Sequence, residues 1–159
     1  MSLNTFDLYL FGGTGDLSNR KLIPAMFRQE TLSSICTESS IIGIGSRNLT
    51  TVEYVEMVKD SLQKYFPNFN QHKDTWKSFS ARISYIQIDI NSDEGWNNLK
   101  EIPADRAVIY YLATPPNLYK RISSALNEFN LIKENCRVVV EKPIGADLNT
   151  AKEINDSLA

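Results

Sequence analysis

The chain has 159 residues, a net charge of −2 at pH 7 and a hydrophobic content of 42%. This length fits one domain with a sizeable core, and the small negative charge argues against nucleic acid as a partner. No apolar run approaches the ~18 residues of a membrane span, and residues 1–5 lack the basic stretch of a signal peptide. Cys36 and Cys136 lie far apart without metal-ligand spacing, so we expect free thiols, no bound metal and a cytoplasmic protein.

The amino-terminal stretch reads as a strand, a glycine turn and a helix. The apolar run 6–11 leads directly into the turn, and Asp16 opens a segment with helical spacing that we place at 17–30. The turn itself consists of Gly12, Gly13, Thr14 and Gly15. This geometry brings backbone N–H groups and the positive end of a helix dipole to one point, where a pyrophosphate is the usual occupant.

In the dinucleotide-binding pattern of three glycines, the third position is occupied by Ser18, which is small enough to let helix and strand pack closely. A tight turn without a ligand is the alternative interpretation. A P-loop is excluded because no Gly-Lys-Ser/Thr closes the turn. Since a carboxylate would repel a phosphate, we interpret Asp16 as a cap or first-turn residue of the helix.

A second apolar run, 41–45, ends in Ser46 and Arg47. At this strand end an acidic residue would hold a free ribose hydroxyl, whereas an arginine accommodates a 2′-phosphate. The pair therefore favours the phosphorylated cofactor, NADP, with a solvated surface arginine as the alternative. The strand end lies roughly 30 residues after the glycines rather than the typical ~20, which implies a longer first crossover.

Strands and helices alternate along the rest of the chain. We expect strands at 6–11, 41–45, 83–88, 107–113 and 137–141. We expect further helices at 52–66, 72–82, 93–101, 119–129 and 147–158. The helix at 52–66 should bury one stripe, formed by Val52, Val55, Val58, Leu62 and Phe66. This pattern predicts an α/β, doubly wound and mainly parallel sheet in the order 3-2-1-4-5, with helices on both faces and a ligand crevice at the carboxyl ends of the strands.

Two other strand ends carry candidate site residues. Asp89 and Ile90 follow the third strand and could line a cofactor crevice, although a turn residue is the simpler interpretation of Asp89. Glu141, Lys142 and Pro143 follow the fifth strand. A lysine there can donate hydrogen bonds to a substrate hydroxyl or carbonyl, whereas in isolation the motif is more often a surface strand end.

Three segments together resemble the amino-terminal signatures of the glucose-6-phosphate dehydrogenase family. They are Phe11 to Pro24, Tyr111 to Pro116 and Val140 to Gly145, in the family's order and at fitting spacing. The resemblance covers essentially the whole chain. It implies a Rossmann-like cofactor domain of an enzyme that oxidises the C1 hydroxyl of glucose 6-phosphate to a lactone and passes hydride to NADP, at the entry to the pentose phosphate pathway. Some family members also use NAD.

The resemblance also implies roles for individual residues. The pyrophosphate would be held by Gly12, Gly13, Thr14, Gly15, Asp16, Leu17, Ser18 and Asn19. Ser46 and Arg47 would hold the 2′-phosphate, and the cofactor would also be lined by Asp89, Ile90 and Tyr119. Lys142 would touch both the substrate and the nicotinamide, and Pro143 would help to position the nicotinamide as a hinge.

The family's substrate motif, Arg-Ile-Asp-His-Tyr-Leu-Gly-Lys-Glu, is not found before Ala159. Alcohol oxidation needs a general base, and the only histidine, His72, lies in a polar region between the second and third strands. We therefore expect residues 1–159 to be an NADP-binding domain that is inactive alone, with the base beyond Ala159. The resemblance places the catalytic and dimerisation surfaces in an absent β+α domain, in a full-length homodimer or homotetramer.

Two other functions fit parts of this pattern. A non-catalytic, redox-sensing domain of the same fold would also bind NADP, but it would need no substrate-facing residue at Lys142. A short-chain reductase would need a Tyr-x-x-x-Lys pair after the fourth strand. Tyr119 is followed four residues later by Ser123, which argues against that class.

Overall fold

The computed structural model describes residues 4–99, 105–141, 149, 152 and 155–156. Lys142 and Pro143 lie outside the described residues, as does most of the helix expected at 147–158. The four described positions of that segment are helical.

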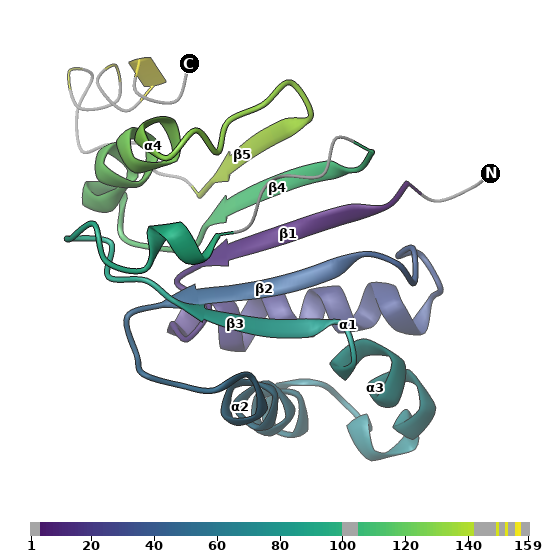
Figure 1. Cartoon of the computed structure of the whole chain (residues 1–159). Helices are drawn as coiled ribbons and strands as arrows, with labels where there is room; N and C mark the ends of the chain where they lie inside the picture. The colour runs from purple at the N-terminus through teal and green to yellow at the C-terminus, as the bar shows by residue number, and fades with distance from the viewer. Residues whose placement is uncertain (1–3, 100–104, 142–148, 150–151, 153–154, 157–159) are drawn as a thin grey trace.

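In the described part of the chain, a five-stranded sheet has the order β3-β2-β1-β4-β5, and every neighbouring pair is parallel. The strands are β1 (Phe6–Phe11), β2 (Ser40–Gly45), β3 (Ile83–Gln87), β4 (Ala107–Leu112) and β5 (Cys136–Val140). The predicted order is therefore confirmed. Because Phe11 pairs with both Ile44 and Leu112, the carboxyl ends of the central strands are level, and the arrows of Figure 1 all point to the same edge.

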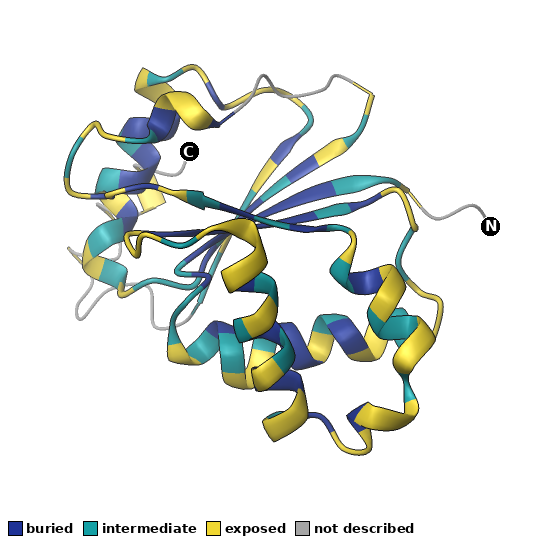
Figure 2. Cartoon of the chain, turned by 60° about the horizontal axis from the view of Figure 1, so that its bottom comes forward, coloured by how far each residue is buried: buried dark blue, intermediate teal, exposed yellow. Residues whose placement is uncertain are grey.

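Helices cover both faces of the sheet, as predicted (Figure 1). One face carries η1 (Ser18–Leu22), α1 (Ile23–Thr31), α2 (Thr51–Tyr65), η2 (Phe69–Gln71) and α3 (Lys73–Ser80). The other carries η3 (Trp96–Asn98), η4 (Pro116–Leu118) and α4 (Tyr119–Glu128). The buried residues of Figure 2 accordingly form a layer on either side of the sheet.

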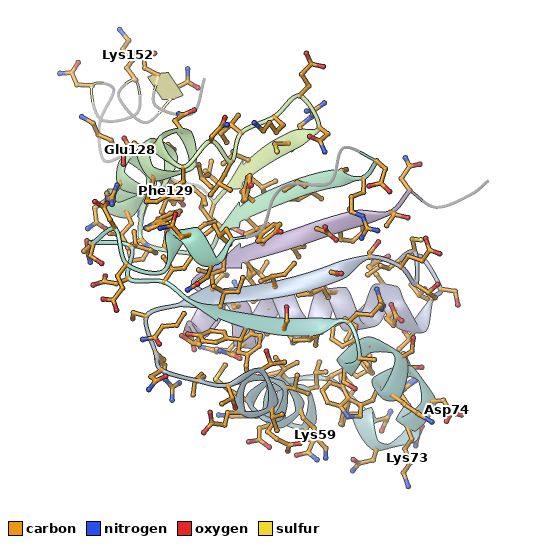
Figure 3. All side chains as sticks on the ribbon, in the orientation of Figure 1. Lys59, Lys73, Asp74, Glu128, Phe129 and Lys152 are labelled. Atoms are coloured by element: carbon orange, nitrogen blue, oxygen red, sulfur yellow. The ribbon has the colours of Figure 1, made fainter. Side chains whose placement is uncertain are left out.

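The two layers are built from aromatic and branched aliphatic side chains. Phe27, Tyr54 and Phe79 are fully buried on one face, and Trp96 is fully buried on the other. Along β1 the side chains alternate between the two cores, which is expected for a central strand with both faces covered. The charged side chains of α2 and α3 point away from the sheet, as Figure 3 shows for Lys59, Lys73 and Asp74.

The buried face of α2 agrees with the predicted stripe except at its first residue. Val58, Leu62 and Phe66 are buried and Val55 packs against the same core, whereas Val52 is 72% exposed. Tyr54 and Ser61 are also buried on this helix. Tyr54 lies against Gly43, where a Cβ would come within 2.3 Å of the phenol ring, so the absence of a side chain at Gly43 makes room for it.

Two other elements also depart from the sequence-based expectation. In its described part, 93–99, the helix expected at 93–101 is reduced to the short η3, because Gly95 has a φ of +91°, a left-handed conformation that interrupts a helix. The first helix opens with a wide π turn, in which the N–H of Ile23 donates to the carbonyl of Ser18. The next residue, Pro24, explains this turn, because it has no N–H and its ring would clash with the carbonyl four residues earlier.

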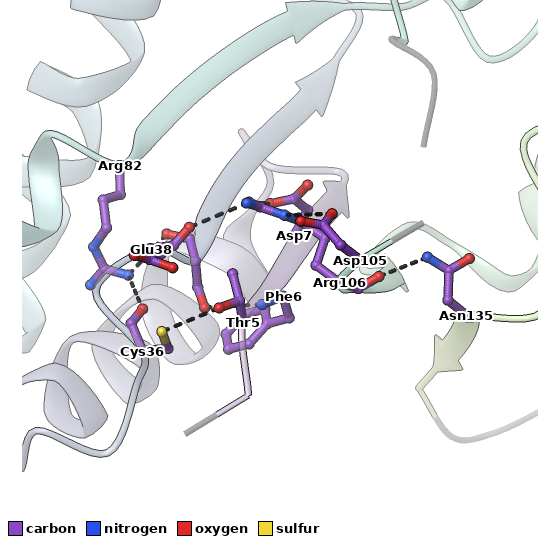
Figure 4. Close-up of polar contacts among 10 residues, drawn as sticks. Thr5, Phe6, Asp7, Cys36, Glu38, Arg82, Asp105, Arg106 and Asn135 are labelled. Atoms are coloured by element: carbon purple, nitrogen blue, oxygen red, sulfur yellow. Dashed lines mark hydrogen bonds and ion pairs between the residues drawn. The ribbon is translucent and has the colours of Figure 1, made fainter. Parts of the chain in front are cut away.

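The amino edge of the sheet is held by ion pairs between distant segments (Figure 4). The Arg82 guanidinium pairs with Glu30 at the end of α1, and both side chains are about nine-tenths buried. It also donates to the carbonyls of Cys36 (3.2 Å) and Ser39 (3.0 Å). These contacts join α1, the segment before β2 and the start of β3.

Candidate functional site

The glycine turn after β1 is attached to both neighbouring strands at the carboxyl edge. The N–H groups of Gly12 and Gly13 both donate to the carbonyl of Ile44 in β2, at 3.0 and 2.9 Å. The N–H of Ala113, just after β4, donates to the carbonyl of Phe11 at 2.9 Å. The position of the turn is therefore set by the sheet.

Gly12 is required for this path of the chain. Its φ is +78°, and a Cβ at this position would lie 2.6 Å from the carbonyl oxygen of Ala113. A side chain would therefore meet both a left-handed backbone and a rigid main-chain atom. The turn passes close to β4 only because residue 12 is glycine.

Side-chain donors bind the carbonyl groups of the turn. Ser18 donates its hydroxyl to Gly12 O at 2.8 Å, which adds a specific contact to the close packing predicted for this position. The Tyr54 phenol donates to Gly13 O at 3.1 Å, and the Asn19 amide to Gly15 O at 2.7 Å. Ser61 in turn donates to the Asn19 side-chain oxygen at 2.8 Å. The carbonyl oxygens of Gly12, Gly13 and Gly15 therefore accept hydrogen bonds from the protein itself.

The amide groups at the start of the helix are arranged differently. The first hydrogen bond of the helix runs from the N–H of Asn19 to Gly15 O, at 3.1 Å. The amide groups of the residues just before Asn19 therefore have no acceptor within the helix. A Cβ at Gly15 would meet only Gly12 O within 4 Å in the described structure. Open space beside helix-terminal amides is the arrangement that accepts a phosphate, so the turn fits a nucleotide pyrophosphate.

Asp16 and Leu17 occupy the first helical turn. The Asp16 carboxylate is exposed and lies 3.4 Å from the Arg20 guanidinium, one turn along the helix. It therefore pairs with a neighbouring cation, and the capping role considered for it is not seen. Pairing with Arg20 offsets the negative charge that would otherwise face an incoming phosphate.

Ser46 and Arg47 form the exposed turn after β2. Their carbonyls accept hydrogen bonds from β3: the Gln87 amide donates to Ser46 O at 3.2 Å and the Tyr85 phenol to Arg47 O at 2.8 Å. The Arg47 guanidinium lies 3.7 Å from the sulfur of Met57, and no carboxylate of the described residues pairs with it. An arginine without a carboxylate partner among the described residues thus follows β2, the strand whose Ile44 carbonyl holds the glycine turn, and this placement agrees with the 2′-phosphate hypothesis.

The remaining candidates lie after β3 and at the start of α4. Asp89 is exposed and accepts a hydrogen bond from the N–H of Asn91 at 3.0 Å, which makes it a turn residue. The side chain of Ile90 is buried in the core, and Tyr119 is 1% exposed with its phenol donating to Glu141 O at 3.4 Å. A direct contact of these residues with a cofactor stays a prediction.

Several residues that brace this edge were not singled out from the sequence. They are Tyr54, Ser61 and Tyr85, described above, and Tyr111, which pairs with Glu141 of the Glu-Lys-Pro motif. The Tyr111 phenol donates to the Glu141 carboxylate, immediately before the Lys142 position. Burial, followed by this hydrogen bond, raises the pKa of Tyr111 to about 12. The only available signal was the position of both residues within the strand-end motifs that carried the family resemblance.

His72 lies on the α3 side of the molecule, away from the carboxyl edge. Its ring packs edge-on against Phe66 and Phe27, with centroid distances of 5.7 and 6.3 Å. This packing agrees with the interpretation that His72 is not the general base. Among the described residues, no three His, Cys, Asp or Glu side chains gather as a metal site, and no described helix has the length and apolarity of a membrane span.

Comparison with known proteins places this geometry in a family. Residues 9–159 match the family described as glucose-6-phosphate dehydrogenase, NAD binding domain. Among curated relatives, the chain is 39% identical to a glucose-6-phosphate 1-dehydrogenase of Gluconobacter oxydans and 36% identical to that of Rhizobium meliloti. Each match covers 96% of this chain and 32% of the relative.

Solved structures agree in fold. The crystal structure of glucose-6-phosphate 1-dehydrogenase from Mycobacterium avium superposes with a TM-score of 0.87 at 30% identity, over 99% of this chain and 34% of that one. A glucose-6-phosphate dehydrogenase in complex with its substrate, glucose 6-phosphate, gives 0.84 at 31% identity, over 100% and 35%. The chain therefore spans about a third of the length of the proteins it resembles.

Proposed function

The chain belongs to the glucose-6-phosphate dehydrogenase family, and from that premise we propose that residues 1–159 act as the NADP-binding domain of such an enzyme. The reaction proposed for the whole protein is the oxidation of glucose 6-phosphate to 6-phosphogluconolactone. The family assignment supports a nicotinamide cofactor, and the choice of NADP over NAD rests on Arg47. The single observation that carries the proposal is a glycine turn in which the carbonyls of Gly12, Gly13 and Gly15 accept hydrogen bonds from side chains, while the amides of residues 16–18 at the start of the helix precede its first hydrogen bond.

Different residues of the chain would bind different parts of the cofactor. The turn from Gly12 to Asn19 would hold the pyrophosphate through those of its amides that do not already donate to a carbonyl of the turn or of β2, and Ser46 with Arg47 would hold the 2′-phosphate. Bound NADP would supply the hydride acceptor. Lys142 would donate a hydrogen bond to the sugar phosphate and Pro143 would help to orient the nicotinamide, while the proton-abstracting base would come from a part of the longer protein that this chain does not cover.

Calorimetric titration with NADP and NAD tests the cofactor assignment. Arg47→Ala should weaken NADP binding more than NAD binding by ~1.5–3 kcal/mol, the range for a charge-assisted contact. Arg137→Ala is the matched control, since Arg137 is exposed at the amino edge and its guanidinium donates to main-chain carbonyls. An equal loss of NADP and NAD affinity in Arg47→Ala would contradict the assignment of the 2′-phosphate.

A second measurement tests whether the chain binds the cofactor without catalysing the reaction. The chain alone should bind NADP without reducing it when glucose 6-phosphate is added, because the base is expected outside it. Absorbance of the reduced cofactor is the readout, and a family member of full length is the positive control. Reduction of NADP by this chain alone would refute the proposal that the base lies elsewhere.

A further inference from the structure

Tyr85 on β3 connects three parts of the carboxyl edge. Its side chain is 8% exposed, and its ring packs against that of Tyr54 with centroids 5.0 Å apart. Its phenol donates to the carbonyl of Arg47 at 2.8 Å, and its own N–H donates to the hydroxyl of Thr51 at 3.1 Å. Tyr85 thus joins β3 to the start of α2 and to the turn that carries Arg47.

Gly45 makes room for this contact. A Cβ at residue 45 would lie 3.0 Å from the Tyr85 hydroxyl and 3.3 Å from the hydroxyl of Thr14 in the glycine turn. The phenol therefore reaches the Arg47 carbonyl past a position that has no side chain. The same position borders the turn that would hold the pyrophosphate, so the contact lies within the site and not behind it.

The Arg47 side chain has little else to hold it. Its guanidinium has only a sulfur contact, 3.7 Å from Met57, among the described residues. A long exposed side chain loses rotamer freedom when it binds a ligand, and a mobile main chain would add to that cost. Fixing the Arg47 carbonyl removes the main-chain part of the cost before the ligand arrives.

We propose that Tyr85 is a positioning residue that sets the preference for a 2′-phosphate, by anchoring the main chain of Arg47. Its neighbour Tyr54 differs in its target, because the Tyr54 phenol donates to Gly13 O in the glycine turn. The two stacked tyrosines therefore brace different halves of the site. Tyr54 supports the part that both nicotinamide dinucleotides share, and Tyr85 supports the part that distinguishes them. This inference rests on the proposed function.

The test compares Tyr85→Phe with Tyr54→Phe, which each remove one hydroxyl and keep the paired rings. The probes are NADP, NAD, 2′,5′-ADP and 5′-AMP, titrated calorimetrically against the chain. Tyr85→Phe should weaken NADP and 2′,5′-ADP about fivefold, as for the loss of one neutral hydrogen bond, and leave NAD and 5′-AMP within about twofold. Tyr54→Phe should weaken all four probes by a similar factor.

A purely structural role for Tyr85 would change all four affinities together. An unchanged ratio of NADP to NAD affinity in Tyr85→Phe overturns the inference, whether both affinities fall by the same factor or both remain at the wild-type value. If the wild type prefers NADP and Arg47→Ala removes the preference while Tyr85→Phe does not, only the inference on Tyr85 fails. If the wild type shows no preference for the 2′-phosphate, the proposed NADP assignment fails and the inference on Tyr85 fails with it.

Discussion

At the amino edge of the sheet the guanidinium groups of Arg82 and Arg106 each meet a carboxylate, Glu30 and Asp7, whereas at the carboxyl edge Arg47 meets none among the described residues. The first two arginines also donate to main-chain carbonyls (Figure 4). A guanidinium with a buried partner stabilises the fold but has little capacity left for an anion. Carboxylate partners therefore hold Arg82 and Arg106 in structural roles at the amino edge, whereas the Arg47 guanidinium at the carboxyl edge keeps its capacity for an anion.

The largest expected effect comes from breaking the amino edge. Glu30→Ala leaves the Arg82 charge nine-tenths buried without its partner, and the loss of one member of a buried pair costs about 3–5 kcal/mol of unfolding free energy. Urea unfolding measures the loss, and NADP affinity of the folded protein should stay unchanged. Glu128→Ala is the control, because its pair with Arg121 is exposed and should be worth less than about 1 kcal/mol. Equal losses in the two variants would show that the amino edge is not a stabilising network.

A smaller effect on stability, with a larger one on binding, is expected at the carboxyl edge. Gly12→Ala forces a side chain into a left-handed conformation at a cost of about 1–2 kcal/mol, and its contact with Ala113 O would displace the turn. NADP affinity should fall about tenfold or more, which calorimetry on the folded variant measures. Gly15→Ala should lose less stability than Gly12→Ala, because its one close contact is 3.1 Å from Gly12 O, and it should still weaken NADP, because its Cβ would enter the open side of the turn. Normal NADP affinity in both variants would remove the glycine turn from the binding site.

The smallest effect appears only at alkaline pH. Burial raises the pKa of the Tyr54 phenol above its usual 10.0, so the folded state keeps this proton where the unfolded chain loses it. Stability from this group is fully present below about pH 10 and declines as the pH rises towards the higher folded value, by about 1.4 kcal/mol at pH ~11. The melting temperature between about pH 8 and 11 should therefore fall less steeply in Tyr54→Phe than in the wild type. Identical slopes would show that Tyr54 is not a buried brace of the glycine turn.

Much of the fold could be predicted because its signals are local. The five strands are short apolar runs, the glycine turn is contiguous, and the handedness of crossover connections leaves few sheet orders. All five strands lie within about one residue of their expected ends. The glycine turn and the Ser46–Arg47 turn could be placed at one edge for the same reason, since parallel strands share a carboxyl edge.

The errors occurred where distant residues decide the outcome. The stripe expected on α2 holds at Val58, Leu62 and Phe66, but Val52 is exposed, and the buried Tyr54, which lies against Gly43, was not expected on it. The helix expected at 93–101 failed at Gly95, whose left-handed backbone runs so close to β3 that a Cβ there would lie 2.4 Å from Gln87 O. Helical periodicity carries no information about what lies opposite a given residue.

The sequence by itself determined the alternation of strands and helices, the glycine turn and the cation after β2, because each depends on residues that are neighbours in the chain. Only the tertiary structure decided which groups brace that turn and which arginines have partners. Glu30 and Arg82 are 52 positions apart, and Asp7 and Arg106 are 99 apart. Such pairs form when folding brings separate segments together, so their geometry depends on packing that no local pattern encodes.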